Sequence, residues 1–312
     1  MKPRLAFVDH SFHKKTRSGD FLRELFATEY QVIDVWDDSW KRDGAPFPVD
    51  DINRGGFSRV FFFQTLPDIE VLRRIGTPMV WAPMYDSVVQ WDRKGDFWLA
   101  LMDLPMKILC FCRTLYDILH GRGLECLYVQ YFMDPAQFVP VMDYRSHRLF
   151  FWQRRRLTFT QVKKIIGENP IAQCIVKLDP DPGFLAMRPS PQDVERYKVT
   201  RIVSGDIERN DYLGLLQQSN IFIAPRTYEG IGMSFLEAMA MGMVVVGMNQ
   251  PTLNEYVRHG ENGWLLENGE SPVEFADIER LGRRARQDCE QGFLVWQTRK
   301  QAIVSYLLED AS

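Results

Sequence analysis

The chain has 312 residues, of which 46% are hydrophobic and 25% are charged, and its formal net charge is −3 at pH 7. This composition is typical of a soluble globular protein. The charges of both signs are interspersed, which excludes the overall basic character of a nucleic-acid-binding protein. The length favours two domains over one.

The five cysteines lack the spacing of a zinc site, and most of them lie in apolar, strand-like runs. We therefore expect buried, reduced thiols. The apolar run at the start of the chain is too short for a signal peptide, and no apolar segment reaches membrane-spanning length. These features predict a cytoplasmic protein, with peripheral contact at the inner face of a membrane as the alternative. The apolar helix at 97–104 is expected to pack inside the protein rather than on a membrane.

The first 140 residues alternate between short apolar runs and helical patterns, such as 20–30 and 112–123. Runs that are apolar on both faces and joined by helices indicate a parallel sheet. Two prolines in the segment 133–147 mark the expected domain boundary. The predicted strands are at 4–9, 31–36, 59–64, 78–83, 107–112 and 126–132.

The second half of the chain repeats this alternation and ends in an amphipathic helix at 292–310. The pattern predicts an α/β protein with two doubly wound, Rossmann-like parallel sheets, which bind ligands at the carboxyl ends of their strands. The predicted strands are at 147–153, 172–178, 198–205, 220–226 and 243–249. The predicted helices are at 158–167, 209–218 and 233–241.

Two acids lie in an apolar segment that begins with the strand at 220–226. Glu229 follows this strand in a glycine-flanked turn, and Glu237 lies inside the helix predicted at 233–241. The order of strand, glycine turn and helix places free backbone N–H groups and a positive dipole end at the helix start, which suits a phosphate. Gly230 and Gly232 allow the backbone to approach the anion closely. The turn is not the dinucleotide fingerprint, because the third glycine is absent.

A buried carboxylate is costly unless it is hydrogen-bonded. A carboxylate at Glu229 would repel a neighbouring phosphate, but it would accept strongly from the hydroxyls of a polyol. Glu237, further along the helix, could meet a second set of hydroxyls. The two acids therefore predict a ligand in the order sugar, diphosphate, ribose.

The sequence "EGIGMSFLEAMAMG" has seven residues between the two glutamates, and it resembles the E-x7-E signature of retaining glycosyltransferases of family 4, which have the GT-B fold. The segment 252–267 resembles that family's sequence after the following strand. The segment 127–140 resembles its last N-domain strand, and the final helix resembles the one that crosses back to the N-domain. The resemblance extends over nearly the whole chain and is strongest at 220–267.

The resemblance implies the roles of individual residues. Glu229 would contact the donor sugar and take part in catalysis, Glu237 would contact the ribose, and backbone N–H groups after Gly230 would hold the diphosphate. In "FFWQRRRLTF", Arg154 matches the family's phosphate-binding arginine, and Arg155 or Arg156 would replace its lysine, since a guanidinium suits a diphosphate. The implied donor-binding residues are Arg154, Arg156, Glu229, Gly230, Ile231, Gly232, Met233 and Glu237.

The resemblance is incomplete on the acceptor side. The first loop keeps only Gly19 of the family's glycine pair, and His10 is a further candidate there. Asp86 is a second catalytic candidate, at a place where the family often has a histidine before the aspartate.

Structural alternatives exist for several of these residues. Glu237 could form an ion pair with a buried arginine, the arginines at 154–156 could be a solvated edge, and Asp86 could be a helix N-cap. His10 and His13 could be surface side chains. The "DPD" at 179–181 is expected to be a loop rather than a metal site.

These features predict a glycosyltransferase that moves a sugar with retention from a nucleoside diphosphate sugar to a hydroxyl of a glycan, glycolipid or other acceptor. The resemblance implies front-face attack, with no metal and no cofactor besides the donor substrate. The predicted domains are an acceptor domain at 1–143, a donor domain at 144–290 and the returning helix at 291–312. The alternatives are a GT-B sugar-nucleotide epimerase and a sugar-nucleotide-binding domain without catalysis.

Overall fold

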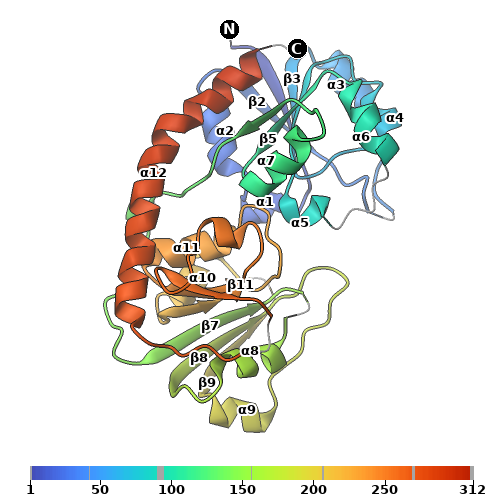
Figure 1. Ribbon diagram of the computed structural model, residues 1–312. Helices are drawn as coiled ribbons and strands as arrows, with labels where there is room; N and C mark the ends of the chain where they lie inside the picture. Colours follow the sequence, from blue (N-terminus) through green and yellow to red (C-terminus); the bar gives the residue numbers. More distant parts are fainter. Residues whose placement is uncertain are drawn as a thin grey trace. The chain divides into compact units, whose positions relative to one another are not determined.

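The structure is a computed structural model that describes residues 2–41, 43–89, 95–155, 157–205, 207–268 and 271–309 (Figure 1). The chain divides into two compact units, of which the first is Met1–Gln130 with Trp296–Ser312 and the second is Tyr131–Val295. Each unit contains one six-stranded parallel sheet, so the predicted fold class is confirmed. Among the described residues, none of the helices combines the length and the apolar character needed to cross a lipid bilayer.

The first unit is built on a sheet whose strands all pair in parallel. Its strands are β1 (Arg4–Asp9), β2 (Gln31–Trp36), β3 (Phe57–Phe63), β4 (Met79–Ala82), β5 (Met106–Cys110) and β6 (Cys126–Tyr128), in the order β2-β1-β3-β4-β5-β6. Its helices are α1 (His13–Thr16), α2 (Asp20–Phe26), α3 (Val49–Arg54), α4 (Ile69–Leu72), α5 (Tyr85–Val88), α6 (Gly95–Met102) and α7 (Arg113–His120). In Figure 1, α3, α4 and α6 lie to one side of this sheet and α2 lies to the other. Central strands such as β4 and β5 are therefore buried along their whole length.

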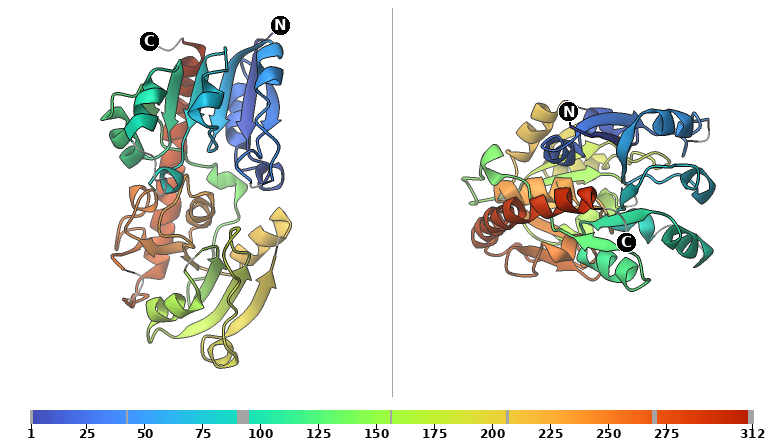
Figure 2. Two further views of the ribbon diagram at one scale, coloured as in Figure 1. Left: turned by 90° about the vertical axis from the view of Figure 1, so that its right-hand side faces the viewer. Right: turned by 90° about the horizontal axis from the view of Figure 1, so that it is seen from above.

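The second unit has the same architecture, and its strands also pair in parallel. Its strands are β7 (His147–Gln153), β8 (Ile171–Leu178), β9 (Val199–Ser204), β10 (Ile221–Ile223), β11 (Val244–Met248) and β12 (Gly263–Leu266), in the order β12-β11-β10-β7-β8-β9. Its helices are η1 (Pro135–Gln137), α8 (Phe159–Ile166), α9 (Pro191–Arg196), α10 (Arg209–Leu216), α11 (Met233–Met241) and η2 (Leu253–Glu255), and α12 (Ile278–Leu308) begins in it. Figures 1 and 2 show α10 and α11 on one face of the sheet and α8 and α9 on the other.

The C-terminal end of α12 is held inside the first unit by basic side chains of the sheet. Arg59 of β3 donates to the carbonyl of Leu307 at 2.7 Å. Lys107 of β5, which is buried, donates to the carbonyl of Tyr306 at 3.2 Å. Cations at a helix C-terminus stabilise its unpaired carbonyls, so these two residues fix the end of α12 to the sheet.

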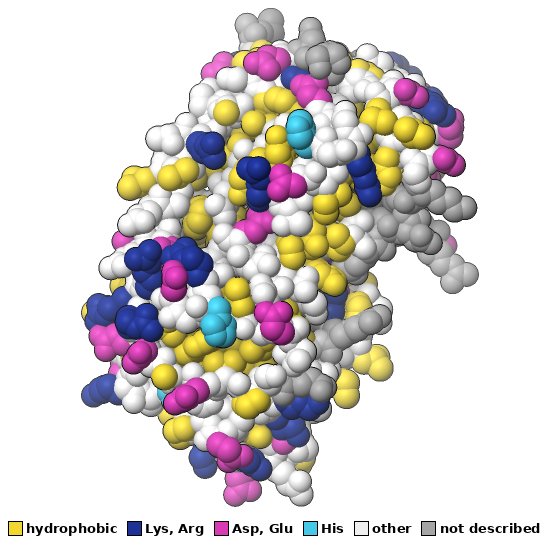
Figure 3. All heavy atoms as spheres, viewed as in Figure 1, with side chains coloured by type: hydrophobic (Ala, Val, Ile, Leu, Met, Phe, Trp, Pro, Cys, Tyr) yellow, Lys and Arg dark blue, Asp and Glu magenta, His cyan; other side chains and the backbone are white. Residues whose placement is uncertain are grey.

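The helix α12 begins at Ile278, well before the predicted start at 291, and its first half buries Ile278, Leu281 and Ala285 while charge pairs lie on its polar side. Arg283 pairs with Glu279 at 2.8 Å and Arg284 pairs with Asp288 at 3.1 Å, each one turn apart on the helix. Figure 3 shows basic and acidic side chains interspersed over the face in view. The strand β12 lies in the segment 252–267 and was not predicted as a strand.

Candidate functional site

The turn between β10 and α11 leaves the helix start open to an anion. Gly232 is the N-cap of α11, and its φ of 81° lies in the left-handed region. A side chain there would also collide with Phe235, whose ring atom lies 1.8 Å from the position of a Cβ. Only glycine fits this position, and glycine has no side chain that could cap the first N–H groups of α11. Those N–H groups and the helix dipole are therefore available to a phosphate.

Glu237 lies one turn into α11, and its side chain is buried. Its carboxylate accepts a hydrogen bond from Arg209 of α10 at 2.6 Å. The predicted alternative was a pair with a buried arginine, but the side chain of Arg209 is 54% exposed. Burial raises the pKa of Glu237, and the opposing effects of Arg209 and of the Tyr212 hydroxyl do not cancel this rise. The carboxylate is thus incompletely compensated in this structure and would gain from further hydroxyl donors.

Glu229 is also buried, and hydrogen bonds with the loop after β11 hold its turn in place. The Thr252 hydroxyl donates to the carbonyl of Glu229 at 3.1 Å and to that of Gly230 at 2.6 Å. The Glu229 N–H donates to the carbonyl of Pro251 at 3.3 Å. These bonds hold the turn rigidly, so the Glu229 carboxylate has a defined place beside the helix start. The Nη1 atom of Arg226 lies 4.0 Å from Glu229 Oε2.

Three arginines converge on one carboxylate at the carboxyl end of the same sheet. Asp181 Oδ1 accepts from Arg154 at 2.6 Å. Asp181 Oδ2 accepts from Arg155 at 2.9 Å and from Arg226 at 2.6 Å. Burial alone would raise the pKa of Asp181, but Arg226, Arg154 and Arg155 together hold that pKa below its ordinary value. Asp181 is therefore ionised at neutral pH and neutralises part of a strongly positive cluster.

Sequence reasoning found Arg154 and Arg155 but missed Arg226. The register of the sheet explains why they meet: Phe151 of β7 pairs with Ile223 of β10, and Arg154 and Arg226 each follow their partner by three residues. Arg154 and Arg226 lie close together because β10 pairs with β7 in the sheet. The order of the strands along the sequence does not show this pairing. Arg156, the other candidate for the phosphate site, lies outside the described residues.

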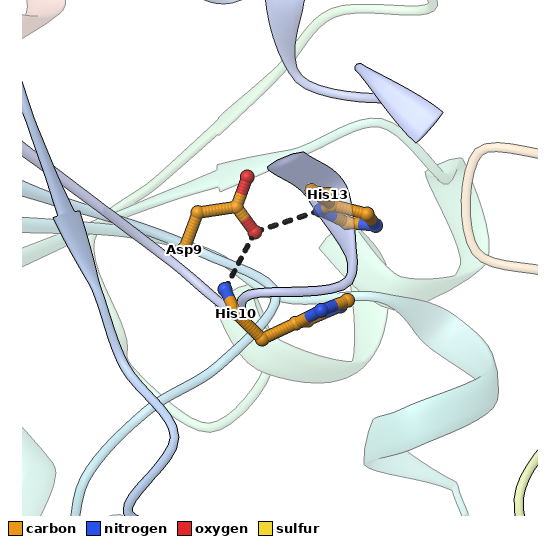
Figure 4. Close-up of side chains that lie close together, drawn as sticks. All are labelled: Asp9, His10 and His13. Carbon is orange, nitrogen blue, oxygen red and sulfur yellow. Dashed lines mark hydrogen bonds and ion pairs between the residues drawn. The ribbon is translucent and has the colours of Figure 1, made fainter. Parts of the chain in front are cut away.

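The acceptor-side candidates belong to the first unit, where His10 and His13 form a cluster with Asp9 at the end of β1 (Figure 4). Asp9 Oδ1 accepts from His13 Nδ1 at 2.7 Å and from the His10 backbone N–H at 2.8 Å. Asp9 Oδ2 accepts from Arg23 at 3.1 Å. His13 is therefore buried and bonded rather than a free surface side chain, and a cation at this place would meet the Arg23 guanidinium and compete with three hydrogen-bond donors.

Burial and the neighbouring His13 lower the pKa of His10, against a smaller opposing effect of Asp9. His10 is thus neutral at neutral pH, and its Nε2 lies 3.3 Å from the Gln64 side-chain oxygen. The other two acceptor-side candidates lie elsewhere in this unit. Gly19 is the N-cap of α2 with an ordinary negative φ. Asp86 is buried in the first turn of α5, whose N-cap is Met84, so the N-cap alternative for Asp86 is wrong.

Comparison with known proteins connects the second unit to a protein family. A family model described as "Glycosyl transferases group 1" matches residues 196–281, which include the glycine turn, α11 and both glutamates. The chain is 28% identical to the amylovoran biosynthesis glycosyltransferase AmsK of Erwinia amylovora, over 29% of this chain and 26% of that protein. It is 33% identical to the putative glycosyltransferase EpsD of Bacillus subtilis, over 23% of this chain and 19% of that protein. The aligned segments thus span about a quarter or less of these relatives.

Solved structures match almost the whole chain. Sucrose-phosphate synthase from Thermosynechococcus elongatus aligns with a TM-score of 0.66 and 13% identity over 98% of both chains. HepE from Anabaena, solved in complex with UDP and glucose, aligns with a TM-score of 0.63 and 13% identity over 97% of this chain and 100% of that chain. The fold is GT-B. Its two Rossmann-like domains correspond to the two units, and residues 196–281 carry the sequence pattern of group 1 glycosyl transferases.

Proposed function

We propose that this GT-B protein is a retaining glycosyltransferase that uses a nucleoside diphosphate sugar as its donor and a hydroxyl group as its acceptor. One observation carries the proposal. Two buried carboxylates, Glu229 and Glu237, flank the open N-terminus of α11, inside the segment that matches group 1 glycosyl transferases.

In this proposal, different residues of the second unit bind different parts of the donor. The backbone N–H groups of Ile231, Gly232 and Met233 and the guanidinium of Arg154 bind the diphosphate, which is negatively charged. Glu237 accepts hydrogen bonds from the ribose hydroxyls, and Glu229 accepts them from the sugar. The second unit is thus the donor domain, and we assign the acceptor to the first unit, with Asp86, His10 and Gly19 as its candidate residues.

The proposed reaction forms a bond between the acceptor oxygen and the anomeric carbon as the bond from that carbon to the β-phosphate oxygen breaks. The acceptor's proton passes to the leaving phosphate oxygen on the same face of the sugar. Negative charge that develops on the diphosphate is stabilised by arginine and by the helix N-terminus, so no metal ion is required. In this proposal, Glu229 stabilises positive charge that develops on the transferred sugar.

The test begins with a panel of nucleotide sugars in a thermal-shift assay. Because HepE was solved with UDP and glucose, uridine diphosphate sugars are the first donors to try. A ligand at a hundred times its dissociation constant should stabilise the protein by about 2.7 kcal/mol. The donor that binds is then incubated with glycan and glycolipid acceptors, and NMR of the product gives its anomeric configuration.

A product with the donor's configuration supports the proposal, and an inverted product contradicts retention. Conversion of the donor into an epimer without an acceptor would identify an epimerase. Tight donor binding with neither transfer nor hydrolysis would identify a binding domain.

A further inference from the structure

The arginine cluster of the second unit holds a carboxylate of the chain itself. Asp181 lies in the loop after β8, and its backbone N–H donates to the carbonyl of Arg154 at 2.7 Å. Its two carboxylate oxygens contact three guanidinium groups at 2.6–2.9 Å. A carboxylate and a phosphate present oxygens to arginine in similar forked geometry. Asp181 therefore has the place and the charge of a bound anion.

The neighbouring aspartate shows that this arrangement is particular to Asp181. Asp179 lies in the same loop, but its carboxylate pairs with Lys177 at 2.6 Å. The Lys177 ammonium and the Arg154 guanidinium both lie over the ring of Trp152, at 4.0 Å and 4.4 Å from its centroid. The tryptophan thus fixes the direction of Arg154, whose side chain is still 29% exposed and can be reached by a ligand.

We propose that the Asp181 carboxylate occupies the phosphate site and that a nucleoside diphosphate displaces this carboxylate from Arg154 and Arg226. In this arrangement, Arg226 takes the role of the absent phosphate-site lysine. This inference rests on the proposed role of Arg154 in binding the donor diphosphate. The arginines are kept in position by Asp181 when the site is empty. The displaced carboxylate competes with the product diphosphate for the same guanidinium groups, which favours product release.

Direct competition has a quantitative signature. It weakens the binding of every anion that uses these arginines by the same factor, and it leaves the binding of a neutral nucleoside unchanged. A carboxylate that only positions the arginines would have the opposite effect, because its loss would weaken the binding of every anion.

The experiment measures dissociation constants of inorganic pyrophosphate, UDP and uridine by calorimetry for the whole chain and its variants. Asp181→Asn keeps the shape of the side chain and removes its charge. We expect this change to tighten pyrophosphate and UDP alike, by about tenfold or more, the size expected for one charge-assisted hydrogen bond. Uridine should be unaffected. Asp181→Glu, which retains the charge, should bind pyrophosphate as weakly as the original chain.

Asp179→Asn is the matched control, because it removes a charge from the same loop without touching the three arginines. It should leave pyrophosphate binding unchanged. Arg226→Gln should weaken pyrophosphate and UDP by about tenfold or more. Asp181→Ser is also neutral and carries the same expectation as Asp181→Asn, so it provides the test if Asp181→Asn does not fold.

Weaker or unchanged pyrophosphate binding in the neutral variants would overturn the inference. Pyrophosphate carries neither nucleoside nor sugar, so its binding tests the arginine cluster independently of the proposed glycosyltransferase activity. If pyrophosphate binding tightens as expected while no nucleotide sugar binds or reacts, the proposed function fails and the inference about Asp181 remains. If donors react but the neutral variants bind pyrophosphate no better, the inference alone fails.

Discussion

Replacing Glu237 with glutamine tests whether its carboxylate binds the ligand or only stabilises the fold. The change removes the negative charge that accepts from Arg209 at 2.6 Å. Because the Arg209 side chain is 54% exposed, water can solvate the guanidinium after the change, and a pair with such an exposed partner contributes at most about 1 kcal/mol. Burial of the carboxylate opposes even this gain. We therefore expect Glu237→Gln to change the free energy of unfolding by less than about 1 kcal/mol.

The effect on nucleotide binding should be much larger. If Glu237 accepts from the ribose hydroxyls, the variant loses a charge-assisted hydrogen bond of roughly 1.5–3 kcal/mol, which is about ten- to a hundredfold in affinity. The ribose is the same in donor and product, so UDP and the donor should weaken equally while turnover at saturation changes little. Calorimetry with UDP and steady-state kinetics measure these two effects. Glu290→Gln, which removes a surface carboxylate paired with Arg286, is the control and should change neither.

The pH dependence of stability gives a second signature of the same residue. Burial raises the pKa of Glu237 above its ordinary value of 4.5, so the folded protein binds this proton more tightly than the unfolded chain. Its contribution to stability is complete below pH 4.5 and is lost as the pH rises through the raised pKa. The stability of the unchanged protein relative to Glu237→Gln should therefore fall as the pH rises above 4.5, as measured by urea unfolding at several pH values.

One combination of results would refute this reasoning. If Glu237→Gln lowers the free energy of unfolding by several kcal/mol and leaves UDP affinity unchanged, the Arg209 pair is structural and the carboxylate does not bind the ribose.

Three further predictions concern the same turn and its chemistry. Glu229→Gln should lower turnover while leaving the UDP dissociation constant nearly unchanged, because its partner is the sugar that moves; loss of UDP binding in calorimetry would reverse the roles of the two glutamates. Gly232→Ala should destabilise the fold by about 1–3 kcal/mol, because of its positive φ and the contact with Phe235. The matched change Gly214→Ala in α10, where nothing lies within 4 Å of the new methyl group, should be neutral or stabilising by about 0.5–1 kcal/mol in urea unfolding. Sugar transfer should persist in excess EDTA, and loss of activity that magnesium or manganese restores would contradict a metal-free diphosphate site.

The sequence predicted α11 with correct ends because both ends are marked by glycine. The helix extends over Met233–Met241, as expected, and Gly232 and Gly242 on either side both have a φ of 81°. Such conformations favour glycine strongly, so the local sequence was enough. Central strands such as β4 and β5 were also predicted, because strands buried on both faces are apolar at every position.

The start of α12 was missed although its first half has an apolar face, because the buried residues Ile278, Leu281 and Ala285 are separated by many charged side chains. Exposed pairs such as Arg283 with Glu279 make this part of the sequence strongly polar, which obscures its hydrophobic periodicity. Arg226 and Asp181 were missed as site residues for a different reason. They reach Arg154 only through the order of strands in the sheet and through the path of the loop after β8, and neither is encoded in a local pattern.

The charges around α11 indicate how its buried acids are stabilised by the protein itself. The named side chains are three buried or half-buried acids, Glu229, Glu237 and Asp181, with Arg226 beside the first, Arg209 beside the second and the three-arginine cluster around the third. Each of these three carboxylates lies against at least one guanidinium, which offsets part of the cost of burying its charge. A diphosphate cannot simply add to such a site, because the arginines that suit it already bind Asp181. Hydroxyl groups can add, because each carboxylate oxygen has more than one lone pair. The diphosphate of the proposed donor would therefore bind by displacing Asp181 from the arginines, whereas the hydroxyls of its sugar and ribose would bind to the carboxylates without displacing a residue. This difference explains why a neutral residue at 181 should tighten binding while a neutral residue at 237 should weaken it.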